Sequence, residues 1–422
     1  MRFLWRQDDR AHHPTRGRIF ALVALAVGLA SGATAAPVRS VGAMTFADPD
    51  TLVLADWRAG EIHALHLPAV SAAPPTPFNL KNVSASIAAA LHTSPENLRF
   101  EDMAFRPGTE LAYVTLSVIQ GDTVPRPALV SVDATGRVGV INLAKTPQTS
   151  APIRDEPSSD KALWHEPEAT YTVTDMVFSK GKLYVAGLSN ASFASTLRVY
   201  DFPFTGGATA TSIEIYHAVH NQIETRAPIR KMAIVSLNGE PTLLAAYTCT
   251  PLVTIPLKDL KDGAHVRGKT IAELGWGSMP VSMVSLDIGQ GPMVLLINSH
   301  RSADLLSVAD LARAAAGAGL TTPIKWPSEP FLGPRATYIP MPGIDRLDTQ
   351  DDKFLAALRR NEASGAMELV SLHKGVFLRL SDFVNEYDFA DFKYGPKDPW
   401  RSAHQMLRTE EGFPDLAARA AN

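Results

Sequence analysis

Cysteine is almost absent from this sequence: Cys249 is the only one among 422 residues. No disulfide can form within the chain, and the Cys-x-x-Cys-His motif that attaches haem is missing. A lone thiol in an oxidising compartment is usually buried and inert, whereas a reactive or metal-binding thiol is the less common case. We therefore expect Cys249 to pack in the interior, and we exclude a disulfide-stabilised scaffold.

An excess of either charge is also missing. The chain has 40 Lys and Arg residues against 43 Asp and Glu residues, which gives a formal net charge of −3. General nucleic-acid-binding proteins carry a basic field that attracts phosphate. We therefore expect no nucleic-acid partner.

Common catalytic and cofactor-binding signatures are lacking. The sequence has neither a Gly-x-Ser-x-Gly nucleophile elbow nor a dinucleotide-binding Gly-x-Gly-x-x-Gly, and no histidine lies close to Cys249 along the chain. The sequence thus leaves open whether the protein is an enzyme.

The N-terminus carries a targeting signal. Five arginines precede an apolar run over residues 19–30, which is too short to span a bilayer comfortably. An Ala-x-Ala cleavage site follows at Ala33-Thr34-Ala35. We expect residues 1–35 to be a signal peptide, the mature protein to be periplasmic or secreted, and no transmembrane segment to remain after cleavage. An uncleaved membrane anchor is the alternative.

Residues 44–65 read as three short strands separated by two turns, and weaker copies of this unit recur along the chain. Each copy begins an antiparallel meander of four strands, which is typical of one blade of a β-propeller. Six copies are visible, and a seventh could lie in residues 144–170 or be assembled from the two termini. We therefore predict an all-β propeller of six to seven four-stranded antiparallel blades over residues 36–383.

Several segments outside the strands complete this prediction. Residues 82–96 are expected to insert a short helix. The last strand of the fifth copy is expected near residues 322–326, and that of the sixth copy at residues 376–380. Residues 384–422 are expected to form a short, helical C-terminal tail that packs on the propeller or is partly disordered.

One apolar position aligns across the copies. The first strands carry, at the same place, Met44, Met103, Met176, Met232, Met283 and Leu347. Methionine fills irregular gaps well, so we interpret this series as core packing near the propeller axis rather than as a redox or copper site.

The loops that lead into the inner strand and follow the second strand open on the same face of a propeller ring. Mapping the repeat onto that geometry predicts a mouth where binding residues gather. The candidate ligand-binding residues are Asp56, Trp57, Arg58, Asp102, Asp175, Arg230, Tyr247, His300, Arg301, Asp345 and Arg360. Arginines there could hold a carboxylate or phosphate through paired hydrogen bonds. The alternative is that these residues form turns and ion pairs between blades.

No cofactor is predicted, although Ca²⁺ is possible. Asp102, Asp175 and Asp345 could converge at the channel mouth and offer the hard oxygen ligands that Ca²⁺ prefers; solvated or salt-bridged carboxylates are the alternative. His217-x-x-His220 could place two imidazoles near each other, but this spacing in a strand puts them on opposite faces. We therefore predict no metal site there.

Two segments resemble blades of the exported YVTN/NHL-type β-propeller superfamily. They are Leu-Val-Leu-Ala-Asp…Ile-x-Ala-Leu over residues 52–65 and Lys-Leu-Tyr-Val-Ala…Leu-Arg-Val-Tyr-Asp over residues 182–201. The resemblance covers most of residues 40–383 and implies a propeller. The superfamily includes binding scaffolds, lyases, lactonases and subunits of quinoprotein dehydrogenases, so the resemblance does not select an activity. The tryptophan-docking repeats of eight-bladed quinoprotein alcohol dehydrogenases are not recognisable.

Two functional hypotheses follow. The first is an exported binding or interaction scaffold whose arginine-rich mouth takes a small anionic ligand or a partner protein. The second is a propeller enzyme, either a metal-assisted hydrolase or lyase or a subunit of a periplasmic dehydrogenase, with His300 as a candidate acid or base.

Overall fold

The computed structural model describes residues 37–375, apart from 75, 122, 164–165, 276–278, 290 and 326–330, together with residues 378, 393 and 395–397. The predicted signal peptide and nearly all of the predicted C-terminal tail lie outside the described residues. No helix in the described part of the chain is long and apolar enough to cross a membrane.

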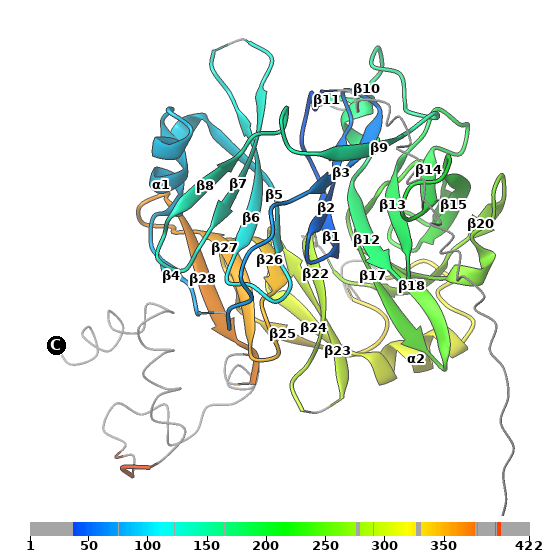
Figure 1. The fold of residues 1–422 in the computed structure, drawn as a ribbon. Coiled ribbons are helices and arrows are strands. Elements are labelled where there is room, and N and C mark those ends of the chain that lie inside the picture. Colours follow the sequence, from blue (N-terminus) through cyan, green and yellow to red (C-terminus); the bar gives the residue numbers. More distant parts are fainter. Residues whose placement is uncertain are drawn as a thin grey trace, which may run out of the picture. The chain divides into compact units, whose positions relative to one another are not determined.

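The described chain is a β-propeller of six four-stranded blades (Figure 1). We number the blades by the order of their inner strands in the sequence. Blade 1 consists of β1 (Met44–Asp48), β2 (Thr51–Asp56), β3 (Glu61–His66) and β9 (Gln148–Pro152). Blade 2 consists of β5 (Leu98–Phe105), β6 (Ala112–Val118), β7 (Arg126–Val132) and β8 (Val138–Ile141). Blade 3 consists of β12 (Asp175–Ser179), β13 (Lys182–Leu188), β14 (Ser195–Asp201) and β15 (Thr209–His217).

The other three blades follow the same antiparallel plan. Blade 4 consists of β17 (Ile229–Leu237), β18 (Glu240–Tyr247), β19 (Pro251–Pro256) and β21 (Lys269–Glu273). Blade 5 consists of β22 (Pro280–Asp287), β23 (Pro292–Asn298), β24 (Ala303–Ser307) and β25 (Ala336–Ile339). Blade 6 consists of β26 (Ile344–Thr349), β27 (Phe354–Arg360), β28 (Met367–His373) and β4 (Asn79–Leu80). The prediction of a propeller is confirmed, with six blades.

The blades do not follow one another around the ring in sequence order. The inner strands contact in the order β5, β1, β12, β17, β22, β26 and back to β5, so blade 2 lies between blades 6 and 1. This order requires two blades to take their outermost strand from elsewhere in the chain. Blade 1 uses β9, which pairs with β3 from Glu61↔Pro152 to Leu65↔Gln148. Blade 6 uses β4, which pairs with β28 at Leu369↔Leu80 and Val370↔Asn79.

The borrowed strands explain where the sequence prediction and the structure differ. The described residues of 144–170 form no seventh blade. They supply β9, the short strands β10 (Ala162–Leu163) and β11 (Glu166–Pro167), and the turn η2 (Glu168–Tyr171). Blade 6 closes with β4 rather than with residues 376–380, most of which lie outside the described chain. Blade 5 closes with β25 rather than near residues 322–326: helix α2 (Val308–Ala316) follows β24 directly, and the chain returns to pair with β24 at β25. The predicted helical insertion is α1 (Val83–Ala90), which is capped where Asn82 accepts a hydrogen bond from Ala85 N.

The strands are apolar without strict alternation because neighbouring blades cover both faces of each sheet. Strand β2 is buried along its whole length. Leu52, Leu54 and Leu65 of blade 1 pack with Tyr113 and Leu129 of blade 2 in one of six buried clusters. Packing between blades therefore holds the ring rigid and leaves the loops free to carry polar groups.

Candidate functional site

A ring of long side chains lines the propeller axis. The aligned series of Met44, Met103, Met176, Met232, Met283 and Leu347 lines a cavity of about 620 Å³, with one side chain from each inner strand. Five of the six are buried, and Met283 packs partly buried against its neighbours. The series thus packs near the axis, as predicted.

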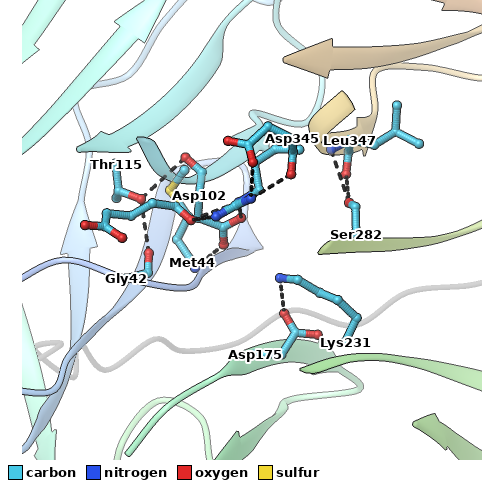
Figure 2. A network of polar contacts seen from close by, with 11 residues as sticks. Gly42, Met44, Asp102, Thr115, Asp175, Lys231, Ser282, Asp345 and Leu347 are labelled. Carbon is cyan, nitrogen blue, oxygen red and sulfur yellow. Dashed lines mark hydrogen bonds and ion pairs between the residues drawn. The ribbon is translucent and has the colours of Figure 1, made fainter. Parts of the chain in front are cut away.

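All but one of the residues that precede this series in the inner strands are polar, and these five form a polar belt (Figure 2). In ring order the six residues are Asp102, Ala43, Asp175, Lys231, Ser282 and Arg346. Every second one accepts a hydrogen bond from the backbone N–H of the next blade. The bonds are Met44 N to Asp102 Oδ2 (2.8 Å), Met232 N to Asp175 Oδ2 (2.8 Å) and Leu347 N to Ser282 Oγ (3.1 Å). The belt therefore ties blade 2 to blade 1, blade 3 to blade 4, and blade 5 to blade 6.

The three carboxylates considered for Ca²⁺ each have a cationic partner. Asp175 Oδ1 lies 2.9 Å from Lys231 Nζ. Arg346 lies between the other two, with its Nε 3.6 Å from Asp102 Oδ1 and its Nη1 3.1 Å from Asp345 Oδ1. Among the described residues, these carboxylates do not form a group whose ligand atoms converge. Burial raises the pKa of Asp175 above its ordinary value, although the adjacent ammonium of Lys231 acts to lower it.

A cavity of about 690 Å³ opens among loops of blades 3, 4 and 5. Most of these loops either lead into an inner strand or follow a second strand. The turn after β15 is the exception. Tyr171, Met279 and His300 line the cavity together with Arg226, which pairs with Glu168 through an Nη2–Oε1 contact of 2.8 Å. The cavity joins apolar surface to a few polar groups, as small-molecule sites usually do.

Arg230 projects into this cavity from a β-bulge. The register of β17 against β18 shifts between Ile229 and Lys231, and the unpaired residue between them is Arg230. The side chain forms no hydrogen bond or ion pair with any residue that the structure describes. Burial lowers the pKa of Arg230 from its ordinary value, because a half-buried guanidinium is less well hydrated than an exposed one. Arg230 is thus a half-buried cation with no anion in hydrogen-bond contact.

Two histidines lie together on another wall of the cavity. His217 ends β15, and His220 lies in the turn before β16 (Gln222–Glu224), so that the two rings have centroids 3.8 Å apart. Glu224 Oε1 contacts both rings, at 2.9 Å from His217 Nδ1 and 2.6 Å from His220 Nδ1. The expectation that the imidazoles lie on opposite faces of a strand is wrong, because the strand ends at His217 and the chain turns.

Cys249 meets the histidines from blade 4. It lies in the turn after β18 with φ of 76°, a left-handed conformation that is uncommon outside glycine. Its side chain is half-buried and lines the cavity, so the expectation of an interior thiol does not hold. The ligand atoms of His217, His220 and Cys249 all lie within 4.8 Å of one another. The tertiary structure therefore gathers one thiol and two imidazoles.

Acidic groups surround His217 and set its charge. Burial alone would lower the pKa of His217, but hydrogen bonds of the His217 ring with Cys249 and Glu224 raise it to about 9. Burial would likewise raise the pKa of Glu224, but the contacts with His217 and His220 lower it to about 2. Glu273, behind Thr250, accepts a 2.6 Å hydrogen bond from Ala218 N, and burial raises its pKa. Without a bound ion, the imidazolium of His217 and the carboxylate of Glu224 therefore form an ion-paired hydrogen-bond network.

A second, more polar concavity of about 890 Å³ lies over blades 1 to 3. Arg39, Arg58 and Arg154 line it, and the guanidinium of Arg58 stacks 4.7 Å from the centroid of the Trp57 ring. Stacking of this kind orients a guanidinium without neutralising its charge.

The structure distributes the predicted mouth residues over several places. Arg230 and His300 share the 690 Å³ cavity, Trp57 and Arg58 line the 890 Å³ concavity, and Asp102 and Asp175 belong to the axial belt. Asp56 and Tyr247 are buried, and Asp56 accepts hydrogen bonds from Ser40 and Arg39 N. Arg301 pairs with Asp304, Asp345 with Arg346, and Arg360 donates to Gly365 O.

A phosphate-loop pattern in the sequence does not form a phosphate-binding loop. Residues 263–270 read Gly-Ala-His-Val-Arg-Gly-Lys-Thr, which matches the spacing of such a loop. They fold instead as β20 (His265–Arg267) and the start of β21. Lys269 Nζ donates to Ala315 O at 2.6 Å, and Thr270 Oγ1 donates to Tyr216 O at 2.6 Å. Both side chains are therefore engaged within the protein.

Comparison with known proteins adds little to this description. No protein-family model matches the chain, and no curated protein matches it. Among solved structures, it is similar to a protein from Bacteroides uniformis ATCC 8492 described as a "putative 6-phosphogluconolactonase". The identity is 12%, the match covers 85% of each chain, and the TM-score is 0.28. A likeness at this score carries no argument, so the blades themselves define the class of protein, a six-bladed β-propeller.

Proposed function

We propose that the protein is an exported β-propeller that binds a small anionic ligand in the 690 Å³ cavity, with Arg230 as the anchoring residue. Export is inferred from the basic, apolar and small-residue segments of the N-terminus. The binding role is inferred from the cavity, whose volume lies in the range of small-molecule sites.

The observation that carries the proposal is the unpaired guanidinium of Arg230. Burying a charge costs free energy unless a partner of opposite charge compensates it. Arg230 has no such partner within hydrogen-bond reach among the described residues, yet it faces a cavity rather than bulk solvent. An anion in the cavity would supply the missing partner, and the planar guanidinium would bind a carboxylate or phosphate through two parallel hydrogen bonds.

The surrounding side chains favour a small ligand over a polymer. Arg226 lies at the exposed rim and is already paired with Glu168, so it offers long-range attraction rather than a second buried anchor. Tyr171 and Met279 contribute apolar surface against which the uncharged part of a ligand can pack. The expected ligand is therefore an organic anion with one charged end.

Isothermal titration calorimetry with citrate, benzoate and inorganic phosphate as probes tests this proposal. We expect at least one probe to bind, and Arg230→Gln to weaken its binding by at least tenfold, because a charge-assisted bidentate contact is lost. Arg137→Gln is the matched control, since Arg137 is an exposed arginine on blade 2. If Arg230→Gln binds each probe as tightly as Arg137→Gln does, this site is wrong.

A further inference from the structure

We propose that His217, His220 and Cys249 bind a divalent transition-metal ion of the zinc class, in a three-ligand site whose remaining coordination position faces the cavity. The inference concerns the same cavity as the anion proposal but does not depend on it, because none of the three metal ligands is a residue that anchors the anion.

The positions of the three donors carry the inference. His217 ends β15, His220 lies in the following turn, and Cys249 lies in the turn after β18, so two blades contribute to one cluster. Their ligand atoms lie within 4.8 Å of one another. A tetrahedral ion with metal–ligand bonds of about 2.0–2.3 Å would hold these atoms about 3.4–3.6 Å apart. The side chain of His220 is 47% exposed and can rotate to close this difference.

Glu224 gives both imidazoles the carboxylate partner that histidine ligands usually have. A histidine ligand usually donates one ring N–H to a carboxylate, which leaves the other nitrogen free to coordinate. Glu224 Oε1 contacts Nδ1 of both His217 and His220, at 2.9 and 2.6 Å, which leaves the Nε2 atom of each ring as the candidate ligand. His217 Nε2 lies 3.2 Å from Thr250 Oγ1 in this structure, so a bound ion would replace that hydrogen bond. One carboxylate thus supports two ligands.

The donor set selects the kind of ion. Two imidazoles and a thiolate suit zinc-class ions, whereas Ca²⁺ and Mg²⁺ prefer oxygen ligands. Cys249 is the only cysteine of the chain, so no intramolecular disulfide competes for its sulfur. Since all three donors line the cavity, the fourth coordination position is open to it, and Met279 and His300 lie along the same cavity wall. Three protein ligands with an open position are typical of catalytic rather than purely structural zinc sites.

Metal titration of the purified, chelator-treated protein tests the inference. We expect one equivalent of Zn²⁺ to bind, and Co²⁺ as a spectroscopic probe to give a thiolate-to-cobalt charge-transfer band. Cys249→Ser should abolish this band, and His220→Ala should weaken binding of both ions by at least tenfold. These two variants are preferred to changes at His217, whose burial makes its replacement a risk to folding.

Two controls make the result specific. His265→Ala removes a partly exposed histidine that contacts Glu214 outside the cavity, and it should leave Zn²⁺ affinity unchanged. Arg230→Gln should also leave Zn²⁺ affinity unchanged, so failure of the anion proposal and failure of the metal proposal can be told apart. Retention of the cobalt band in Cys249→Ser, or Zn²⁺ binding no tighter in the wild type than in His220→Ala, would overturn the site. The cluster would then be an ion-pair network only.

Discussion

Asp175 offers a direct test of how the polar belt around the propeller axis holds blades 3 and 4 together. Its Oδ2 accepts a hydrogen bond from Met232 N at 2.8 Å, and its Oδ1 lies 2.9 Å from Lys231 Nζ. The two side chains are only 11% and 15% exposed. Asp175→Ala leaves a buried N–H and a largely buried ammonium without partners, which together should cost about 3 kcal/mol in the free energy of unfolding.

The amide replacement separates the hydrogen bond from the charge. Burial raises the pKa of Asp175 although Lys231 is adjacent, so the attraction to Lys231 does not fully compensate for the lost hydration of the carboxylate. Asp175→Asn keeps an oxygen acceptor for Met232 N while it removes the buried negative charge. Lys231 Nζ still loses its carboxylate partner, so we expect Asp175→Asn to cost about 2 kcal/mol, less than Asp175→Ala by the one hydrogen bond that it keeps.

Urea unfolding followed by circular dichroism measures both values. Ser282→Ala, at an equivalent position of the belt, should cost about 1 kcal/mol because only neutral hydrogen bonds are lost. Asp201→Ala is the control, since its ion pair with Lys182 is exposed and should contribute less than about 0.5 kcal/mol. The reasoning fails if Asp175→Asn destabilises the protein as much as Asp175→Ala, or if Asp175→Ala matches Asp201→Ala.

Two further predictions concern backbone packing and pH. Gly187→Ala should cost more than about 3 kcal/mol or prevent folding, because the added Cβ would lie 2.0 Å from Thr172 O. The control Gly206→Ala should be neutral, because the space around Gly206 is open. Equal urea midpoints for the two variants would contradict this prediction. Burial raises the pKa of Asp304 from 3.8 to about 6, so the folded state binds this proton more tightly than the unfolded chain. The resulting stabilisation is present below pH 4 and is lost as the pH rises through 6. The stability of the wild type relative to Asp304→Asn should therefore fall by about 2.4 kcal/mol between pH 4 and pH 7, and a constant difference would refute the assignment.

The local pattern of the sequence was sufficient to predict the blades. Apolar runs such as that of residues 52–55 and 183–186 are buried by neighbouring sheets on both faces, and the turns between strands are short, so strand positions follow from nearest neighbours along the chain. The aligned methionines were also interpretable, because an apolar residue at a repeated position of the inner strand can only point toward the axis or a neighbouring blade.

The order of the blades could not be predicted in this way. Each sheet accepts an outermost strand through backbone hydrogen bonds, which depend little on sequence. Strand β4, only two residues long, and strand β9 therefore carried no signal that assigns them to blades 6 and 1. Their assignment depends on which sheet edge lies nearby after the chain has folded.

The candidate sites, too, have features that the sequence predicts and features that only the tertiary structure decides. The sequence by itself determined the strands, the repeat, the axial series and the presence of Arg230 at the start of an inner strand. Only the tertiary structure decided that Arg230 is left unpaired at a bulge, and that His217, His220 and Cys249 meet. The physical reason is that the turn after His217 reverses the chain, and the packing of blade 3 against blade 4 brings in a thiol from about thirty residues away.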